Sequence, residues 1–179
     1  MNGRTRFTLL TALAVFVVPG TAAAQSEGFG LEATAGYQDL GGSSFEQVGG
    51  GFSWDAVAYK LWRSGWEVGV GVGFAYPSTG VTSSDLTTFS IYAQPMKHFN
   101  MDGRTRPFVG AQIGYTDASF SDSADLRNGG YGMLTILLGF EIWFSERWAF
   151  TASGFAGGLS GQGETTSRAG IRGGLRVLF

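Results

Sequence analysis

The sequence R-A-G-I-R-G-G-L-R-V-L-F, at residues 168–179, alternates with a period of two. One phase is apolar or small, and the other carries three arginines separated by glycines. A period of two is that of a β-strand whose opposite faces lie in different surroundings. We expect such a strand to be paired along both edges, as it would be in a closed barrel. The apolar phase contains Ile171, Leu175, Val177 and Phe179.

The beginning of the chain has the parts of a secretory signal peptide. Arg4 and Arg6 precede an apolar run over residues 7–18, and three alanines at positions 22–24 supply small residues for cleavage. The run is shorter than the roughly 18 apolar residues of a spanning helix, and no later segment has one like it. We therefore predict a signal peptide over residues 1–24 and an exported domain over residues 25–179, which can enter a membrane only through strands.

The composition excludes several classes of partner and chemistry. The full chain has 12 Lys+Arg and 14 Asp+Glu, so removal of Arg4 and Arg6 leaves 10 against 14, a net charge of −4. This acidic balance argues against a nucleic-acid partner. The lack of cysteine excludes disulfides and thiol chemistry. Charged residues make up 15% of the chain, against about 25% in typical soluble domains, and a lipid-facing surface would explain the deficit.

Seven further segments alternate like the last one, so the sequence predicts eight antiparallel strands. In the second segment, apolar residues occupy both phases, which suggests a β-bulge. The connections alternate between short and long, as do the periplasmic turns and extracellular loops of membrane barrels. Segments of this length suit a tilted membrane strand, which needs about 9–11 residues. The expected strands are residues 28–40, 48–61, 66–76, 85–98, 107–116, 130–144, 148–157 and 168–179, with long loops at 117–128 and 158–166.

Aromatic residues gather at the two ends of these segments. Amphipathic rings prefer the two interfaces of a membrane, so two girdles are expected. The predicted periplasmic girdle consists of Trp62, Trp66, Trp143 and Trp148, and the predicted outer girdle of Tyr37, Trp54, Tyr76, Tyr115 and Tyr131.

The run P-F-V-G-A-Q-I-G-Y at residues 107–115 and the terminal strand carry a family resemblance. Over the whole exported domain, the chain resembles small outer-membrane β-barrel proteins: the OmpA transmembrane domain, OmpX-like and opacity-like proteins. The resemblance implies an all-β, eight-stranded antiparallel up-and-down transmembrane β-barrel in the outer membrane of a Gram-negative cell. It also implies surrounding lipids and lipopolysaccharide as partners, a monomer, and recognition of Ile171, Leu175, Val177 and Phe179 by the barrel-assembly machinery.

The phase opposite to the apolar one should face a narrow lumen. Closing the barrel places the last strand beside the first, so we expect Arg172 and Arg176 to flank Glu32. Isolated charges in so narrow a space are costly, whereas paired ones are tolerated, and an eight-stranded interior is just wide enough for its side chains to fill. The sequence therefore predicts an ion-pair network that blocks the lower lumen, formed by Glu32, Glu67, Glu141, Arg172 and Arg176.

The sequence favours a structural, envelope-integrity role without catalysis, and a minor porin-like channel for ions or small solutes is the alternative. Lipid A deacylases and palmitoyltransferases share this architecture, but His98, the only histidine, is predicted at the periplasmic interface without a Ser-His-acid cluster. The loop acids Asp117, Asp122 and Asp125 lack the spacing of a calcium loop. We therefore predict no catalytic, cofactor or metal site.

Overall fold

The computed structural model describes residues 27–41, 48–79, 86–120, 129–161 and 163–179. The predicted signal peptide lies outside the described residues, so its cleavage site remains a prediction. Among the residues that are described, no helix is long and apolar enough to cross a membrane.

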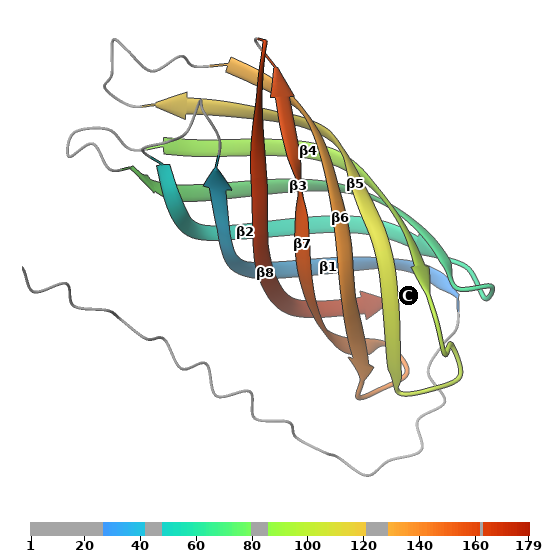
Figure 1. The fold of residues 1–179 in the computed structure, drawn as a ribbon. Coiled ribbons are helices and arrows are strands. Elements are labelled where there is room, and N and C mark those ends of the chain that lie inside the picture. The colour runs from blue at the N-terminus through green and yellow to red at the C-terminus, as the bar shows by residue number, and fades with distance from the viewer. Residues whose placement is uncertain (1–26, 42–47, 80–85, 121–128, 162) are drawn as a thin grey trace, which may run out of the picture.

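Eight antiparallel strands form one closed barrel (Figure 1). Each strand pairs with its neighbours in the sequence, and the last strand pairs with the first, so both edges of the terminal segment are satisfied as expected. The predicted all-β up-and-down architecture is confirmed. The strands are β1 (Gly28–Gly41), β2 (Val48–Leu61), β3 (Trp66–Thr79), β4 (Leu86–His98), β5 (Thr105–Phe120), β6 (Gly129–Trp143), β7 (Trp148–Gly161) and β8 (Glu164–Leu178).

The strands on the loop side continue past the ends predicted from side-chain alternation. β5 extends to Phe120, and the expected loop at residues 158–166 is wrong, since β7 and β8 remain paired up to Gly161 and Glu164. Backbone hydrogen bonds need no alternation of side chains, so the glycine- and serine-rich end of β7 pairs as well as its apolar part. The turn of this hairpin includes Gly163 at φ +82°, a conformation that glycine adopts readily.

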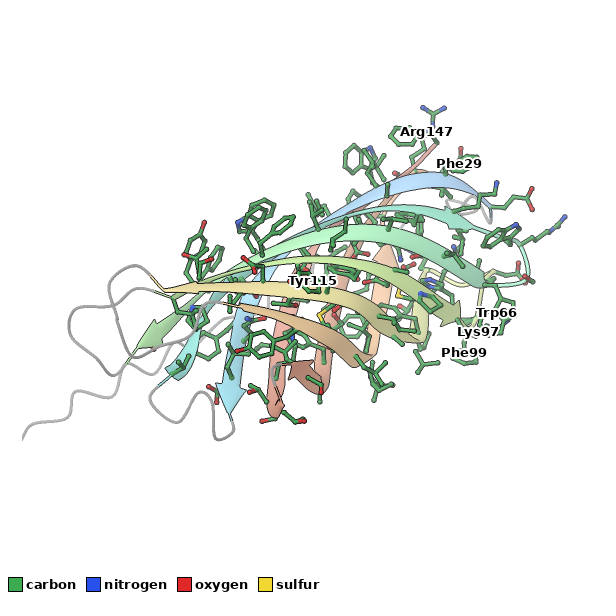
Figure 2. All side chains as sticks on the ribbon, turned by 90° about the horizontal axis from the view of Figure 1, so that it is seen from above. Phe29, Trp66, Lys97, Phe99, Tyr115 and Arg147 are labelled. Atoms are coloured by element: carbon green, nitrogen blue, oxygen red, sulfur yellow. The ribbon has the colours of Figure 1, made fainter. Side chains whose placement is uncertain are left out.

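The outer face of the barrel is apolar along the strands. Side chains at alternate positions point outward, and among them Val70 is 61%, Leu138 63% and Ile171 70% exposed. Figure 2 shows Trp66 and Phe99 at the outside of the barrel, and Tyr115 is 51% exposed. A continuous apolar surface of this kind is stable only against another apolar phase, which the bilayer core supplies.

Aromatic residues also pack across neighbouring strands on this outer face. Trp54, Phe74 and Phe89 lie directly opposite one another on β2, β3 and β4. The rings of Trp54 and Phe74 stack with centroids 4.6 Å apart, and those of Phe74 and Phe89 lie 4.9 Å apart. Such cross-strand pairs fix the register of adjacent strands as well as contributing packing energy.

The apolar residues in both phases of β2 do not mark the position of a β-bulge. Val57, Tyr59 and Leu61 are all buried in the lumen, while Phe52 and Trp54 point outward. Both phases are apolar because one faces outward and the other helps to fill the interior. The register irregularity of β2 against β3 lies instead between Val48 and Gly51, near the loop end.

Many apolar and polar side chains are buried in the described interior of the barrel. One end of the barrel, the short-turn end, carries the turns that join β2 to β3, β4 to β5 and β6 to β7. Apolar residues fill this end, among them Leu61, Trp143 and Leu178, which are at most 2% exposed. Large rings are accommodated where the facing strand carries glycine. A Cβ at Gly71 would lie 2.6 Å from the ring of Tyr92, so this glycine makes room for a lumenal tyrosine.

Val70→Arg should destabilise the barrel by about 2–4 kcal/mol, because it places a cation on the lipid-facing wall near the bilayer midplane. Unfolding titrations in lipid vesicles measure the change. Phe144→Arg is the matched control, since Phe144 is also exposed but follows the end of β6, where the cost falls to about 0–1 kcal/mol. Equal costs at the two positions would contradict the assignment of the outer face to lipid.

Candidate functional site

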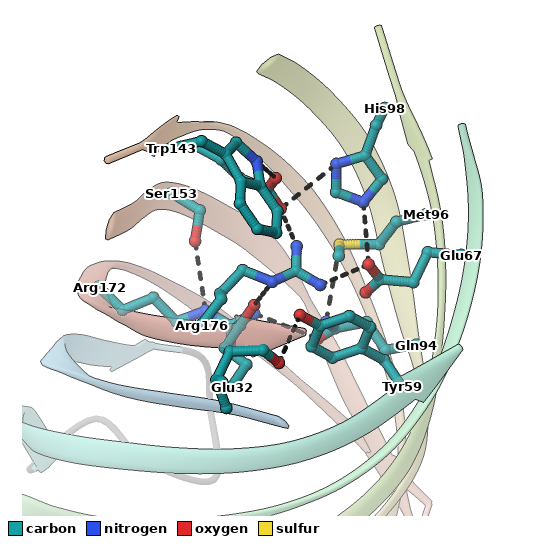
Figure 3. A network of polar contacts seen from close by, with 12 residues as sticks. Glu32, Tyr59, Glu67, Gln94, Met96, His98, Trp143, Ser153, Arg172 and Arg176 are labelled. Atoms are coloured by element: carbon teal, nitrogen blue, oxygen red, sulfur yellow. Dashed lines mark hydrogen bonds and ion pairs between the residues drawn. The ribbon is translucent and has the colours of Figure 1, made fainter. Parts of the chain in front are cut away.

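Arg176 on β8 lies at the centre of a charged cluster in the lower lumen (Figure 3). Its Nε is 3.2 Å from Oε2 of Glu32. Its two terminal nitrogens contact the carboxylates of Glu67 and Glu141. The guanidinium also lies over the ring of Tyr59, 4.0 Å from the centroid. The side chain is 1% exposed, so its charge is neutralised by protein groups rather than by bulk water.

The closure of the barrel positions this arginine. In the β1–β8 register, Glu32 is the direct partner of Arg176, so the pair follows from the backbone alignment. Glu67 is the second residue of β3, and Glu141 lies near the end of β6. Both are therefore close to the short-turn end, where they reach Arg176 from across the lumen.

His98 belongs to the same cluster. Its Nε2 is 3.1 Å from Oε2 of Glu67, and its Nδ1 is 3.4 Å from Oε1 of Glu141. The ring is 1% exposed, so the prediction of an interfacial histidine is wrong. His98 is the last residue of β4 and shares the inward phase of Gln94 and Met96. Its ring therefore lies inside the lumen.

Trp143 also lies in the lumen, and its assignment to the periplasmic girdle is wrong. It is 2% exposed, and its Nε1 donates a hydrogen bond of 2.9 Å to Oε2 of Glu141. Arg106 lies over its indole, 4.8 Å from the ring centroid. Trp143 is two residues after Glu141 and therefore shares its phase. Tyr131 lies in the same inward phase of β6 and is 4% exposed, so its assignment to the outer girdle is also wrong.

A second charged group lies further from the short-turn end. Arg172 forms an ion pair of 3.3 Å with Asp55, and its Nε and Nη2 donate to Ser153 and to Gln94, both at 3.2 Å. The hydroxyl of Tyr92 donates a bond of 2.7 Å to Asp55. Arg172 thus pairs with Asp55 rather than with Glu32, because it lies opposite Gly36 in the β1–β8 register.

The buried charges of the described residues balance in number. Four carboxylates face four arginines, with His98 in addition. Sequence reasoning missed Asp55, Arg106 and Arg168, although each lies in an inward phase that could have revealed it. Arg168 donates a hydrogen bond of 3.0 Å to Oε1 of Gln38, and its guanidinium lies over the ring of Phe155. The buried carboxylates are Glu32, Asp55, Glu67 and Glu141, and the buried arginines Arg106, Arg168, Arg172 and Arg176.

The other residues predicted for the girdles and the assembly signal are on the outer face. Val177 is half-buried there, while Ile171, Leu175 and Phe179 are 50–70% exposed. The exposed aromatic residues of the two predicted girdles are Trp62, Trp66, Trp148, Tyr37, Trp54, Tyr76 and Tyr115.

The cluster has limited chemical capacity. In the part of the chain that the structure describes, the polar contacts of His98 are Glu67 and Glu141, and no serine hydroxyl is among them. This arrangement lacks the nucleophile of a Ser-His-acid site. Glu67, His98 and Glu141 offer one ligand atom each within 4.8 Å of one another, a spacing that a metal ion could use.

Arg176→Ala should lower the free energy of unfolding by about 3–5 kcal/mol, the usual cost of removing one member of a buried charged group. The loss leaves Glu32, Glu67 and Glu141 facing one another without their shared partner. Denaturant titrations of the refolded protein measure the effect. Arg147→Ala is the control, because Arg147 lies exposed in the turn between β6 and β7, and such changes usually stay within about 0.5 kcal/mol. A silent Arg176→Ala would mean that these charges line a hydrated cavity without effective pairing.

Comparison with known proteins identifies the fold family. The chain matches the family described as "Outer membrane protein beta-barrel domain" over residues 8–175. None of the curated proteins gives a significant match.

Solved structures agree with this family match. Neisserial surface protein A has a TM-score of 0.70 at 18% identity, with 84% of this chain and 97% of that chain covered. OprG from Pseudomonas aeruginosa has a TM-score of 0.57 at 12% identity, with coverages of 88% and 99%. The N-terminal barrel domain of Pseudomonas aeruginosa OprF has a TM-score of 0.53 at 18% identity, with coverages of 85% and 98%. Identities this low show a common fold and nothing finer. The closed eight-stranded barrel, its apolar outer wall and the family match together show that the chain belongs to the outer membrane β-barrel domain family and is an integral protein of the Gram-negative outer membrane.

Proposed function

We propose that this protein is a structural barrel that supports envelope integrity and has a closed lumen and no catalytic activity. The observation that carries the proposal is the position of Arg176, whose guanidinium connects β8 to carboxylates on β1, β3 and β6. A single side chain thereby bridges walls on opposite sides of the lumen. A conducting pore would need a continuous aqueous path through this position.

The groups on either side of the cluster support a closed lumen. Towards the short turns, Trp143 and the apolar side chains of Leu61 and Leu178 fill the barrel. Towards the loops, Gln94 accepts hydrogen bonds from both Gln112, at 3.0 Å, and Arg172. An eight-stranded barrel is narrow enough for layers of side chains to fill it completely.

The absence of a nucleophile beside His98 supports the non-catalytic part of the proposal. Both ring nitrogens of His98 face carboxylates. The ring lies inside the lumen at the end of the barrel with the short turns, away from the outer leaflet where lipid A is anchored. A lipid-modifying reaction would need an accessible catalytic group on the outer side. A lipid A modification assay with the refolded protein should therefore give no product.

The unmodified protein should show no steady conductance in planar bilayers, because the Arg176 cluster and the layers around it leave no aqueous path. Arg176→Ala should give brief openings, since the bridge across the lumen is lost, whereas Arg147→Ala should remain closed. Single-channel recording measures both. A large and stable conductance in the unmodified protein would contradict the closed lumen and support a minor channel for ions or small solutes.

The partners that we propose follow from the two faces of the barrel. The apolar outer wall binds membrane lipid and the acyl chains of lipopolysaccharide, and no polar seam on the described strands calls for a second copy, so we propose a monomer. The exposed alternate residues of β8, together with Phe179 directly after the strand, are proposed as the segment that the assembly machinery recognises.

Phe179→Ala and Leu178→Ala should have different effects. Phe179 is 63% exposed, so its truncation should slow assembly in cells while leaving the stability of the refolded barrel nearly unchanged. Leu178 is 0% exposed, and its truncation should lower stability by about 2–5 kcal/mol through a cavity in the core. Heat-modifiable mobility on unboiled gels measures assembly, and denaturant titration measures stability. The same defect in both variants would remove the reason for assigning recognition to Phe179.

A further inference from the structure

The base of the lumen contains a group of potential metal ligands that the closed-barrel function does not require. Glu67, His98 and Glu141 come from β3, β4 and β6, and their ligand atoms converge within 4.8 Å. They are 0%, 1% and 0% exposed. We propose that these three residues form a binding site for a divalent transition-metal ion of the Zn²⁺ class.

The hydrogen-bonding capacity of His98 is the first argument. Nε2 and Nδ1 both face carboxylate oxygens, at 3.1 Å and 3.4 Å. A neutral imidazole donates from only one ring nitrogen, and ionised carboxylates only accept, so one ring nitrogen directs its lone pair at an acceptor. Nδ1 of His98 and Oε1 of Glu67 have no hydrogen-bond partner among the described residues. With a neutral His98, two of the three proposed ligands therefore present a buried lone pair that the surrounding protein groups leave unsatisfied.

The local charges are the second argument. Glu32, Glu67 and Glu141 share one arginine, Arg176, as their ion-pair partner among the described residues. These three carboxylates thus carry more negative charge than Arg176 alone neutralises. Imidazole and carboxylate oxygens are ligands that Zn²⁺ and related divalent ions accept, and three protein ligands with one open position form a common coordination set.

Arg176 competes with the proposed ion, since it contacts both Glu67 and Glu141. It has two further partners that do not belong to the ligand set: Glu32 at 3.2 Å and the ring of Tyr59 at 4.0 Å. The arginine can keep these two contacts while yielding the other carboxylates to a doubly charged ion. We therefore expect Arg176→Gln to bind metal more tightly than the unmodified protein, because the competing charge is removed.

The ligands lie at the short-turn end but are closed off in the folded barrel. His98 ends β4, and Trp143, which donates to Glu141, ends β6. Since none of the three ligands is more than 1% exposed, metal should be supplied while the barrel folds rather than afterwards. The experiment therefore uses refolding into detergent in the presence of Co²⁺, whose visible absorption reports its ligands.

The chain contains one histidine and no cysteine, so any imidazole signal in an untagged protein must come from His98. We expect the unmodified protein and Glu146→Gln, which alters an exposed turn carboxylate, to retain Co²⁺ equally after desalting. His98→Gln should bind far more weakly, since even outer-shell partners of metal ligands are worth about 10–100-fold in affinity. Binding that is equal in all three proteins, or absent from the unmodified protein, would overturn the proposal.

A second measurement covers the case in which His98→Gln does not fold. The imidazole resonances of the unmodified protein, which arise from one residue, should shift when the protein is refolded with Zn²⁺ and return after refolding with a chelator. Unchanged resonances would overturn the site. They would indicate that a proton on His98, rather than a metal ion, balances the carboxylates that face it. Neither result bears on whether the lumen conducts, so failure of the metal site is separate from failure of the proposed function.

Discussion

The ion pair between Glu32 and Arg176 crosses the seam between the first and last strands of the barrel. Every other strand pair is joined by a turn or loop, whereas β1 and β8 are joined only by hydrogen bonds and side chains. The carboxylates of Glu67 and Glu141 then connect this closing seam to β3 and β6. The seam that has no covalent connection is thus the one from which the lumenal charge network extends.

The network depends on how strongly the lumen excludes water. A buried charge is tolerated only when partners neutralise it and hydrogen bonds satisfy its remaining atoms. Arg172 illustrates this, because Asp55 balances its charge while Ser153 and Gln94 accept from its other nitrogens. The polar interior and the apolar exterior reverse the arrangement of a soluble protein. The reversal explains why a chain with so few charged residues concentrates many of them inside.

The strand pattern and the closed barrel could be predicted from the period of two, because the two faces of each strand lie in different environments. The inward positions of Glu32, Glu67, Glu141, Arg172 and Arg176 follow from the same parity. The positions of His98 and Trp143 were predicted wrongly because aromatic and imidazole rings at strand ends suit an interface as well as a lumen. The prediction followed the residue type instead of the inward phase that each position has in its strand. The partner of Arg172 could not be predicted, since contacts across the lumen depend on barrel tilt and register rather than on sequence spacing.

The charge network also discriminates among registers that the apolar outer face would permit. A slip of one residue at the β1–β8 seam exchanges the lipid and lumen faces, and the hydrophobic pattern alone forbids it. A slip of two residues keeps each face but places Arg176 opposite Gly30 or Thr34 instead of Glu32. Lipid contacts change little in that case, while a buried charge loses its direct partner. Since replacement of buried ion pairs by apolar groups is often neutral for stability, we expect the distinct physical effect of these charges to be a penalty on closure in the wrong register.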